Sequence, residues 1–389
     1  MPIANLPKLI IVLVFIIFAL VLGIFVYGYL QTRDEGNSTK PIKLIENNQT
    51  VRPTENLKPV ETIKPTESPE TVGLEVYKSE LFVEANWGTG KGEVGLSNPS
   101  EQGIEDAGPN YGPQSFDVDE TTGHLFLLDS VSSRVIEYDG SGKYINDFPV
   151  KYMMSEDIRV RDNFIYVFEY GIPAISKYTI AGEFIEDYKI PSSDIIESPF
   201  LGLEFDVNRS IMLGFMEREK GIKYGSFEAG RKYKFYQIGK NGDEYKNNNY
   251  IGYQSKDGKE YYLLGGIVKS SSEVERYILV FNRKNELQRE IRTGLFKGDL
   301  PYFSGFDKND NIYLEIQYTG EGSGIEIRKY DREGKLLAVL EVSELAEKND
   351  FIWWYTRIFK KQRVSENGDV YLMFSDIKEI KIYKYSKVE

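Results

Sequence analysis

The sequence of 389 residues has no cysteine and a single histidine, His124. The absence of cysteine excludes disulfide bonds, thiolate metal sites and a cysteine nucleophile. One imidazole cannot serve a site that needs two, and no serine lies in a G-x-S-x-G motif, so we do not expect a serine triad. The chain also lacks a basic run, and its formal net charge is -12 with a pI near 5.0. We therefore expect no nucleic-acid partner.

Aromatic residues are plentiful, at 14% of the chain, with Tyr 28 and Phe 22. Tyrosine and phenylalanine favour β-strands, so the composition predicts an all-β protein.

The first segment with a clear pattern is Leu9–Leu30, which contains no charged residue. A helix of this length, at about 1.5 Å per residue, spans the hydrocarbon core of a bilayer of about 30 Å. The sequence predicts an uncleaved transmembrane signal anchor at 9–30 after a short cytoplasmic tail at 1–8. A cleaved signal peptide is the alternative. We expect the remainder outside the cytoplasm of a single-pass cell-membrane protein, because long domains translocate largely regardless of charge.

Residues 31–75 form a Pro-, Thr- and Glu-rich linker, with the dense stretch KPVETIKPTESPE. Low hydrophobicity and regular prolines predict a disordered, extended spacer. The folded domain is expected at 76–389.

The unit of that domain is SFDVDETTGHLFLLDSVSSRVIEYDGSGKYINDFPV, residues 115–150. Four apolar-rich runs separated by turn residues predict a four-stranded antiparallel sheet. Similar third strands end at Tyr178, Tyr236, Phe281, Tyr330 and Tyr385, at intervals of about 40 to 60 residues. We therefore predict a six-bladed β-propeller. Its last blade lacks one strand, and Leu74–Asn86 is expected to supply it and close the ring.

Blade one carries a family signature. Trp87-Gly88-Thr89-Gly90-Lys91-Gly92, then Gly112-Pro113-Gln114-Ser115-Phe116-Asp117-Val118-Asp119, precede LFLLDSVSSRVIEYDGSGKY. This order resembles the NHL-repeat β-propellers and the wider six-bladed, TolB-like class. Ser133 stands where that family usually has an asparagine. The resemblance implies a fold rather than an activity, since relatives include both binding modules and lactonases or lyases.

Alignment of the innermost strands places four charged residues at one equivalent position: Asp117, Arg159, Asp206 and Arg363. They would line the central channel, where several blades converge, and could hold an ion or a small anion. The alternative is a self-satisfied set of buried ion pairs.

The loops between second and third strands and between blades are expected to gather on one face, where propeller ligands commonly bind. Candidates for ligand contact there are Glu169, Tyr170, Trp353, Trp354 and Tyr355. Aromatic residues of this kind can anchor a partner, and packing of the tryptophans between blades is the competing interpretation.

The sequence predicts a membrane-anchored, extracytoplasmic binding or scaffolding module, without catalytic residues or a cofactor, whose ligand is a protein, a peptide or a glycan. A calcium-dependent lactonase or lyase is the alternative, because carboxylates such as Asp117, Glu156 and Asp206 could supply oxygen ligands. A sensory ectodomain that acts through a membrane partner is a third hypothesis.

Overall fold

The computed structural model describes residues 73–97, 110–170, 172, 174–190, 200–205, 211–217, 222–224, 227–229, 232–238, 245–248, 252–270, 273–294, 300–318, 324–342, 356–357 and 361–388. The chain divides into two units, Met1–Pro65 and Thr66–Glu389, and every described residue belongs to the second. Within these residues, no helix is long and apolar enough to cross a membrane. The predicted anchor at 9–30 and nearly all of the linker lie outside them.

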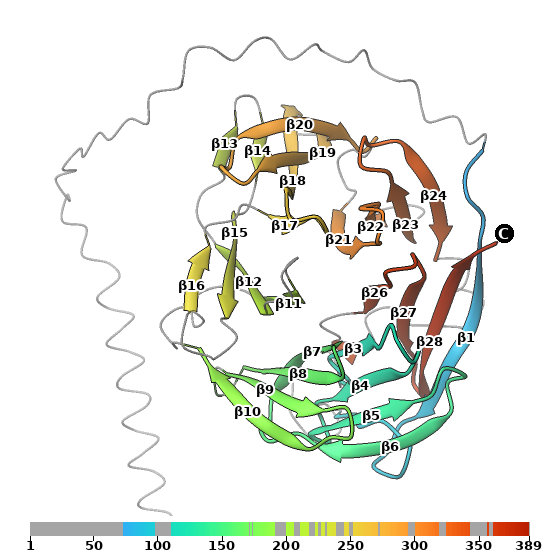
Figure 1. The fold of residues 1–389 in the computed structure, drawn as a ribbon. Coiled ribbons are helices and arrows are strands. Elements are labelled where there is room, and N and C mark those ends of the chain that lie inside the picture. Colours follow the sequence, from blue (N-terminus) through green and yellow to red (C-terminus); the bar gives the residue numbers. More distant parts are fainter. Residues whose placement is uncertain are drawn as a thin grey trace, which may run out of the picture. The chain divides into compact units, whose positions relative to one another are not determined.

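The described residues form five four-stranded antiparallel sheets, as expected for propeller blades (Figure 1). The first two are β3 (Ser115–Val118), β4 (Leu125–Asp129), β5 (Arg134–Tyr138), β6 (Tyr144–Pro149), and β7 (Ser155–Arg161), β8 (Phe164–Glu169), β9 (Ala174–Thr179), β10 (Phe184–Lys189). The third is β11 (Phe200–Phe205), β12 (Ile211–Glu217), β15 (Lys232–Ile238), β16 (Tyr245–Asn248). The fifth along the chain is β21 (Leu300–Phe306), β22 (Ile312–Tyr318), β23 (Gly324–Tyr330), β24 (Leu336–Glu341). The last is β26 (Gln362–Val364), β27 (Val370–Ser375), β28 (Glu379–Lys387) and β1 (Tyr77–Asn86).

The sheet in the fourth position differs from the prediction of four strands. It contains β17 (Tyr253–Gln254), β18 (Glu260–Ser270), β19 (Glu273–Asn282) and β20 (Leu287–Arg292), together with β13 (Ile222–Tyr224) and β14 (Phe227–Ala229). β13 and β14 are a hairpin from the long insertion of the preceding blade, and Glu228 pairs with Gly266 of β18. β18 is long enough to pair with both β17 and β14, so the insertion extends this sheet. A short parallel pair, β2 (Asn110–Tyr111) and β25 (Thr356–Arg357), stands apart from these sheets.

The sheets pack face to face through apolar clusters. One cluster lies between the first and second blades, around Phe126, Val135, Ile158 and Ile165, and comparable clusters separate most other neighbours. This packing explains why every residue of β4 and of β27 is buried. A middle strand of a blade touches a neighbour on both faces, and its sequence therefore reads as a continuous apolar run rather than an alternation.

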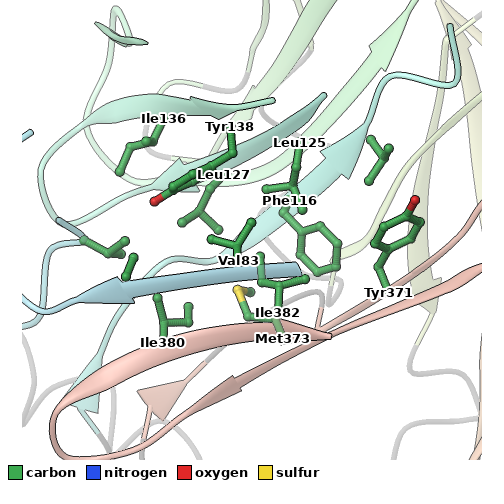
Figure 2. Packing of buried hydrophobic residues seen from close by; sticks show 13 residues of the cluster. Val83, Phe116, Leu125, Leu127, Ile136, Tyr138, Tyr371, Met373, Ile380 and Ile382 are labelled. Carbon is green, nitrogen blue, oxygen red and sulfur yellow. The ribbon is translucent and has the colours of Figure 1, made fainter. Parts of the chain in front are cut away.

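The last sheet is completed by the first strand of the described chain. β1 pairs antiparallel with β28, from Tyr77 opposite Lys387 to Asn86 opposite Glu379, with a bulge between Leu81 and Val83. Figure 2 shows the cluster that results, in which Val83 of β1 lies among Ile382, Met373 and side chains of the first blade. The sheet thus joins both ends of the described chain, and its fourth strand covers an edge that would otherwise be open.

In each of the five four-stranded sheets, a hairpin turn joins the first and second strands. These turns lie at the same end of the inner strands. Hairpin ends are Val118 opposite Leu125, Arg161 opposite Phe164, Phe205 opposite Ile211, Phe306 opposite Ile312 and Val364 opposite Val370. Backbone contacts link these turns directly. Lys308 donates its N–H to the Glu366 carbonyl at 2.8 Å, and the Glu366 N–H donates to Glu120 at 2.8 Å. We call this end the hairpin end.

Gly142 lies where the closing strand β1 meets the first blade, and replacing it tests how closely the two pack. Its φ is +80°, and an added Cβ would lie 1.5 Å from the carbonyl oxygen of Phe82, the bulged residue of β1. Gly294 has a similar φ of +70° but open space around its Cβ position. Gly294→Ala should cost only the left-handed backbone strain, about 1–2 kcal/mol. Gly142→Ala should cost about 1–3 kcal/mol more, because the closing strand must shift. Urea denaturation of both variants measures the difference, and equal losses would contradict the tight junction.

Candidate functional site

The predicted inner row is assembled from the first strands of successive sheets. Asp117 lies on β3, Arg159 on β7 and Arg363 on β26, while Asp206 lies outside the described residues. Glu204 of β11, two residues before Asp206, faces Arg159 instead, with 3.5 Å between Nη2 and Oε2. Asp117 and Glu204 thus flank Arg159, and the two arginines of the row have very different surroundings.

Arg363 is buried and fully engaged. Its side chain is 5% exposed. Its Nε donates to the carbonyl of Phe116 at 2.7 Å, and Nη2 donates to Ser115 Oγ at 2.9 Å, to Asp157 Oδ1 at 2.5 Å and to the Ile158 carbonyl at 3.1 Å. All of these acceptors belong to the first two blades. Arg363 is thus a structural joint between the closing sheet and the first two blades.

Asp157, which the sequence analysis did not single out, is the partner at the centre of this joint. Its side chain has no exposed surface. Besides Arg363, it accepts hydrogen bonds from Ser115 Oγ at 2.5 Å, its neighbour Ile158 N–H at 2.9 Å and Leu203 N–H at 2.7 Å. Four sheets therefore meet at one carboxylate. The sequence signal was the polar S-E-D start of the strand SEDIRVR, which by itself resembles an ordinary turn.

Asp117 shares in the same network. Its carboxylate accepts the Val160 N–H at 2.8 Å and lies 3.5 Å from Arg159 Nε and 3.7 Å from Arg363 Nε. Burial raises the pKa of Asp117, although both guanidinium groups and the backbone N–H stabilise its charged form. With these partners Asp117 is held in place rather than presented to a ligand.

Arg159 differs from Arg363 because its donors are not used. The structure gives its guanidinium two ion pairs, both at 3.5 Å, and no hydrogen bond to any described residue. Its Nε is buried without a hydrogen-bond partner in the described part of the chain. The neighbouring carboxylates Asp117 and Glu204 raise the pKa of Arg159 against the effect of burial, so the group stays charged. Arg159 is therefore a charged side chain whose N–H donors make no hydrogen bond to a described residue.

Arg159 lines a cavity of about 250 Å³ at the hairpin end of the inner strands. Its charged and polar wall comes from five sheets and their hairpin turns: Arg159, Arg161, Glu204, Gln254, Ser255, Lys256, Ser304, Lys308 and Glu366. Its apolar wall is formed by Phe205, Met212, Tyr253, Tyr261, Phe303, Phe306 and Val364. The size and mixture suit a small ligand with a polar and an apolar side. The cavity lies at the opposite end of the inner strands from the loops in which the sequence analysis expected ligands.

The loop-face candidates are only partly described. Trp353, Trp354 and Tyr355 lie outside the described residues, and Tyr170 is 42% exposed. Glu169, expected at the surface, is fully buried at the end of β8. Ser155 Oγ donates to its Oε2 at 2.5 Å, and its Oε1 has no partner among the described groups. Burial raises the pKa of Glu169 to about 8, and the Ser155 hydroxyl opposes that rise.

The described residues offer no obvious calcium site. Among them, no three His, Cys, Asp or Glu side chains lie close enough together to hold a metal ion. Asp307, in the acidic stretch 307–311, accepts hydrogen bonds from Asn309 N–H at 2.9 Å, from Asn311 Nδ2 at 2.8 Å and from Tyr313 OH at 3.1 Å. These are the hydrogen bonds of an ordinary Asx-type hairpin turn.

No protein-family model matches the sequence, and no curated protein matches it. The family resemblance of blade one is thus without a family match. Among solved structures, a member of the DUF4221 family from Bacteroides vulgatus is 12% identical, covers 81% of this chain and 100% of its own, and has a TM-score of 0.44.

Two further β-propellers are similar at the same level. A streptogramin B lyase is 14% identical and covers 80% of this chain and 98% of its own, with a TM-score of 0.42. A gluconolactonase from Xanthomonas campestris is 11% identical and covers 79% and 99%, also with a TM-score of 0.42. The sheets described above define the class: an all-β propeller of four-stranded antiparallel blades. The similar structures include a lyase and a lactonase, and their activities are their own.

The contrast between the two arginines predicts unequal losses of stability when each is replaced. Arg363→Met leaves Asp157 buried without its cation and should cost about 3–5 kcal/mol. Arg159→Gln breaks no hydrogen bond, and Asp117 keeps Arg363 and the Val160 N–H, so its cost should be about 1 kcal/mol or less. Equilibrium urea unfolding of the two variants measures both. Comparable losses would show that Arg159 is as structural as Arg363.

The raised pKa of Glu169 predicts that the stability of the protein depends on pH. Because its pKa is about 8 in the folded protein and 4.5 in the reference state, the folded protein binds the extra proton between these values. The associated stability is complete below pH 4.5 and is lost as pH rises towards 8, at up to about 1.4 kcal/mol per unit. Glu169→Gln keeps the shape without the titration. The free-energy difference between wild type and variant should therefore fall between pH 5 and 8 and then level off, whereas parallel profiles would refute the shift.

Proposed function

We propose that this chain is a membrane-anchored, extracytoplasmic propeller that acts as a non-catalytic binding module. Its ligand site is the cavity at the hairpin end, and the ligand is a protein, a peptide or a glycan that presents an anionic group there. The observation that carries the proposal is Arg159: a charged guanidinium at the cavity wall that makes no hydrogen bond to a described residue. Guanidinium groups with free donors recognise carboxylate and related anions through paired hydrogen bonds.

The charge around the cavity supports an anionic ligand. Arg161 lies over the ring of Phe205, 5.2 Å from its centroid, and has no ion pair with a described residue. Lys308 Nζ donates to the neutral Asn367 side chain at 3.0 Å. Lys256 is matched by Glu366 at 3.9 Å. Two cations of the wall, Arg161 and Lys308, therefore have no carboxylate partner among the described residues. The cavity lining carries an excess of positive charge in a protein that is negative as a whole.

The remaining parts of the proposal rest on sequence. The anchor at 9–30 and the spacer at 31–75 would hold the propeller outside the cell membrane, with reach set by the linker. We also interpret the six-stranded sheet as a sixth blade enlarged by the β13–β14 hairpin, which gives the six-bladed, TolB-like arrangement related to NHL repeats.

Binding without turnover accords with the described chemistry. The alternative, a calcium-dependent lactonase or lyase, needs several carboxylates around one metal ion. In the described part of the wall, Glu204 and Glu366 are separate carboxylates, and Asp117 is held by two arginines. No observation in the described sheets favours this alternative.

The proposal is tested with full-length protein in lipid nanodiscs on an array of neutral and acidic glycans and of peptides with free or amidated C-termini. Wild type should bind acidic members, and Arg159→Gln should weaken that binding by about 100-fold because a charge-assisted pair is lost. Lys259→Gln is the matched control: it removes a cation from the turn that follows β17, and that side chain is 73% exposed and does not line the cavity. Three results would contradict the proposal: binding that Arg159→Gln leaves unchanged, binding confined to neutral members, or no binding at all. Metal-dependent breakdown of a bound array member would favour the enzyme.

A further inference from the structure

We infer that the ligand of the hairpin-end cavity is a hydroxylated monocarboxylate of monosaccharide size, such as a hexuronic acid. The inference rests on the proposed function, because it takes the cavity as the ligand site, and it goes further by naming the chemical class. It is based on three features of the cavity wall: the charges around Arg159, the polar side chains without a described hydrogen-bond partner, and the apolar side.

The first step is the carboxylate. Arg159 and Arg161 are two residues apart on β7 and both line the cavity, so one anionic group can meet both guanidinium planes. Asp117 and Glu204 lie on either side of Arg159, each at 3.5 Å. These carboxylates limit the negative charge that the position tolerates. A singly charged carboxylate therefore suits the site better than a doubly charged phosphate.

The second step is the demand for hydroxyl groups. The Gln254 amide donates from Nε2 to the Tyr261 hydroxyl at 3.1 Å, which turns Oε1 away from that contact. Oε1 is buried and has no donor among the described residues. A carboxylate cannot satisfy it, because it is itself an acceptor. A ligand that brings a donor, such as a hydroxyl, is therefore the kind that suits this group.

Ser304 supplies a third unused group on another sheet. It is the residue at which the β21–β22 register shifts, between Phe303 and Gly305, and such a bulge redirects one side chain of a strand. Its Oγ is buried without a described partner. Together with Arg159 Nε, residues of the cavity wall thus carry three buried polar atoms without a hydrogen-bond partner among the described residues. Their positions on three different blades call for a ligand with several polar groups.

The third step is the apolar side. The rings of Tyr253 and Phe303 stack at 4.1 Å between centroids with an angle of 18°, and both line the cavity. Such a fixed aromatic surface suits the C–H face of a sugar ring. A volume of about 250 Å³ accommodates roughly one such ring rather than a longer segment of chain.

The test is isothermal titration of the full-length protein with D-glucuronate, D-glucose, acetate, glycine and inorganic phosphate at constant ionic strength. Glucuronate should bind at least about 100-fold more tightly than glucose, which lacks the charge, and about tenfold or more above acetate, which lacks the hydroxyl groups. A tetrasaccharide with a terminal glucuronate identifies the source. Equal affinity indicates a glycan end, and affinity at least tenfold weaker indicates the free sugar acid.

Variants separate the two parts of the ligand. Arg159→Gln should lower the affinity for glucuronate and for acetate alike, whereas Gln254→Met should lower glucuronate affinity about tenfold and leave acetate unchanged. Lys259→Gln should change neither. If acetate, glycine or phosphate binds as tightly as glucuronate through Arg159, the inference is wrong while the binding function stands. If no anion binds through Arg159, here or on the array, both are wrong.

Discussion

The propeller depends on one buried carboxylate. Asp157 has no exposed surface and receives donors from Arg363, Ser115 and Leu203, which belong to three different sheets around its own. A charge in such a place is tolerable only with a complete set of partners. The ion pair therefore fixes the relative position of the inner strands where the closing sheet meets the first blades. The strand pairing of β1 with β28 closes the same region from the outside.

Because the inner wall is fixed in this way, Arg159 can keep N–H donors that are free to bind a ligand. Arg363 and Arg159 occupy comparable places on first strands, yet the acceptors around Arg363 are all used and those around Arg159 stand at 3.5 Å. A guanidinium held by packing and by distant carboxylates is preorganised and still has donors available. The β21 bulge at Ser304 and the amide of Gln254 follow the same pattern at the same cavity. In each case a polar side-chain atom without a described hydrogen-bond partner is carried by a strand that is paired within its sheet.

The fold class was predictable because it depends on repeated local signals. Apolar runs such as LFLLD and VYLMFS, separated by turn residues, recur often enough to predict four-stranded blades. The enlarged fourth sheet was not predictable, because the pairing of Glu228 with Gly266 joins segments whose patterns do not depend on each other. Alignment proposed the inner row, but it could not assign the roles of its members. Whether an arginine is engaged depends on backbone carbonyls such as those of Phe116 and Ile158, which no side-chain pattern reveals. For the same reason Glu169 was expected in a surface loop, although it is the buried end of a strand.

The division of roles between the two arginines is the central claim, and phenylglyoxal labelling of the native full-length protein tests it most directly. Phenylglyoxal reacts with accessible, uncommitted guanidinium groups, and peptide mass spectrometry reports each site separately. The side chain of Arg159 is 20% exposed and that of Arg363 is 5% exposed. The account predicts that Arg159 is modified well before Arg363, and that Arg363 reacts only when the protein unfolds. Equal rates in the folded protein, or faster modification of Arg363, would contradict it.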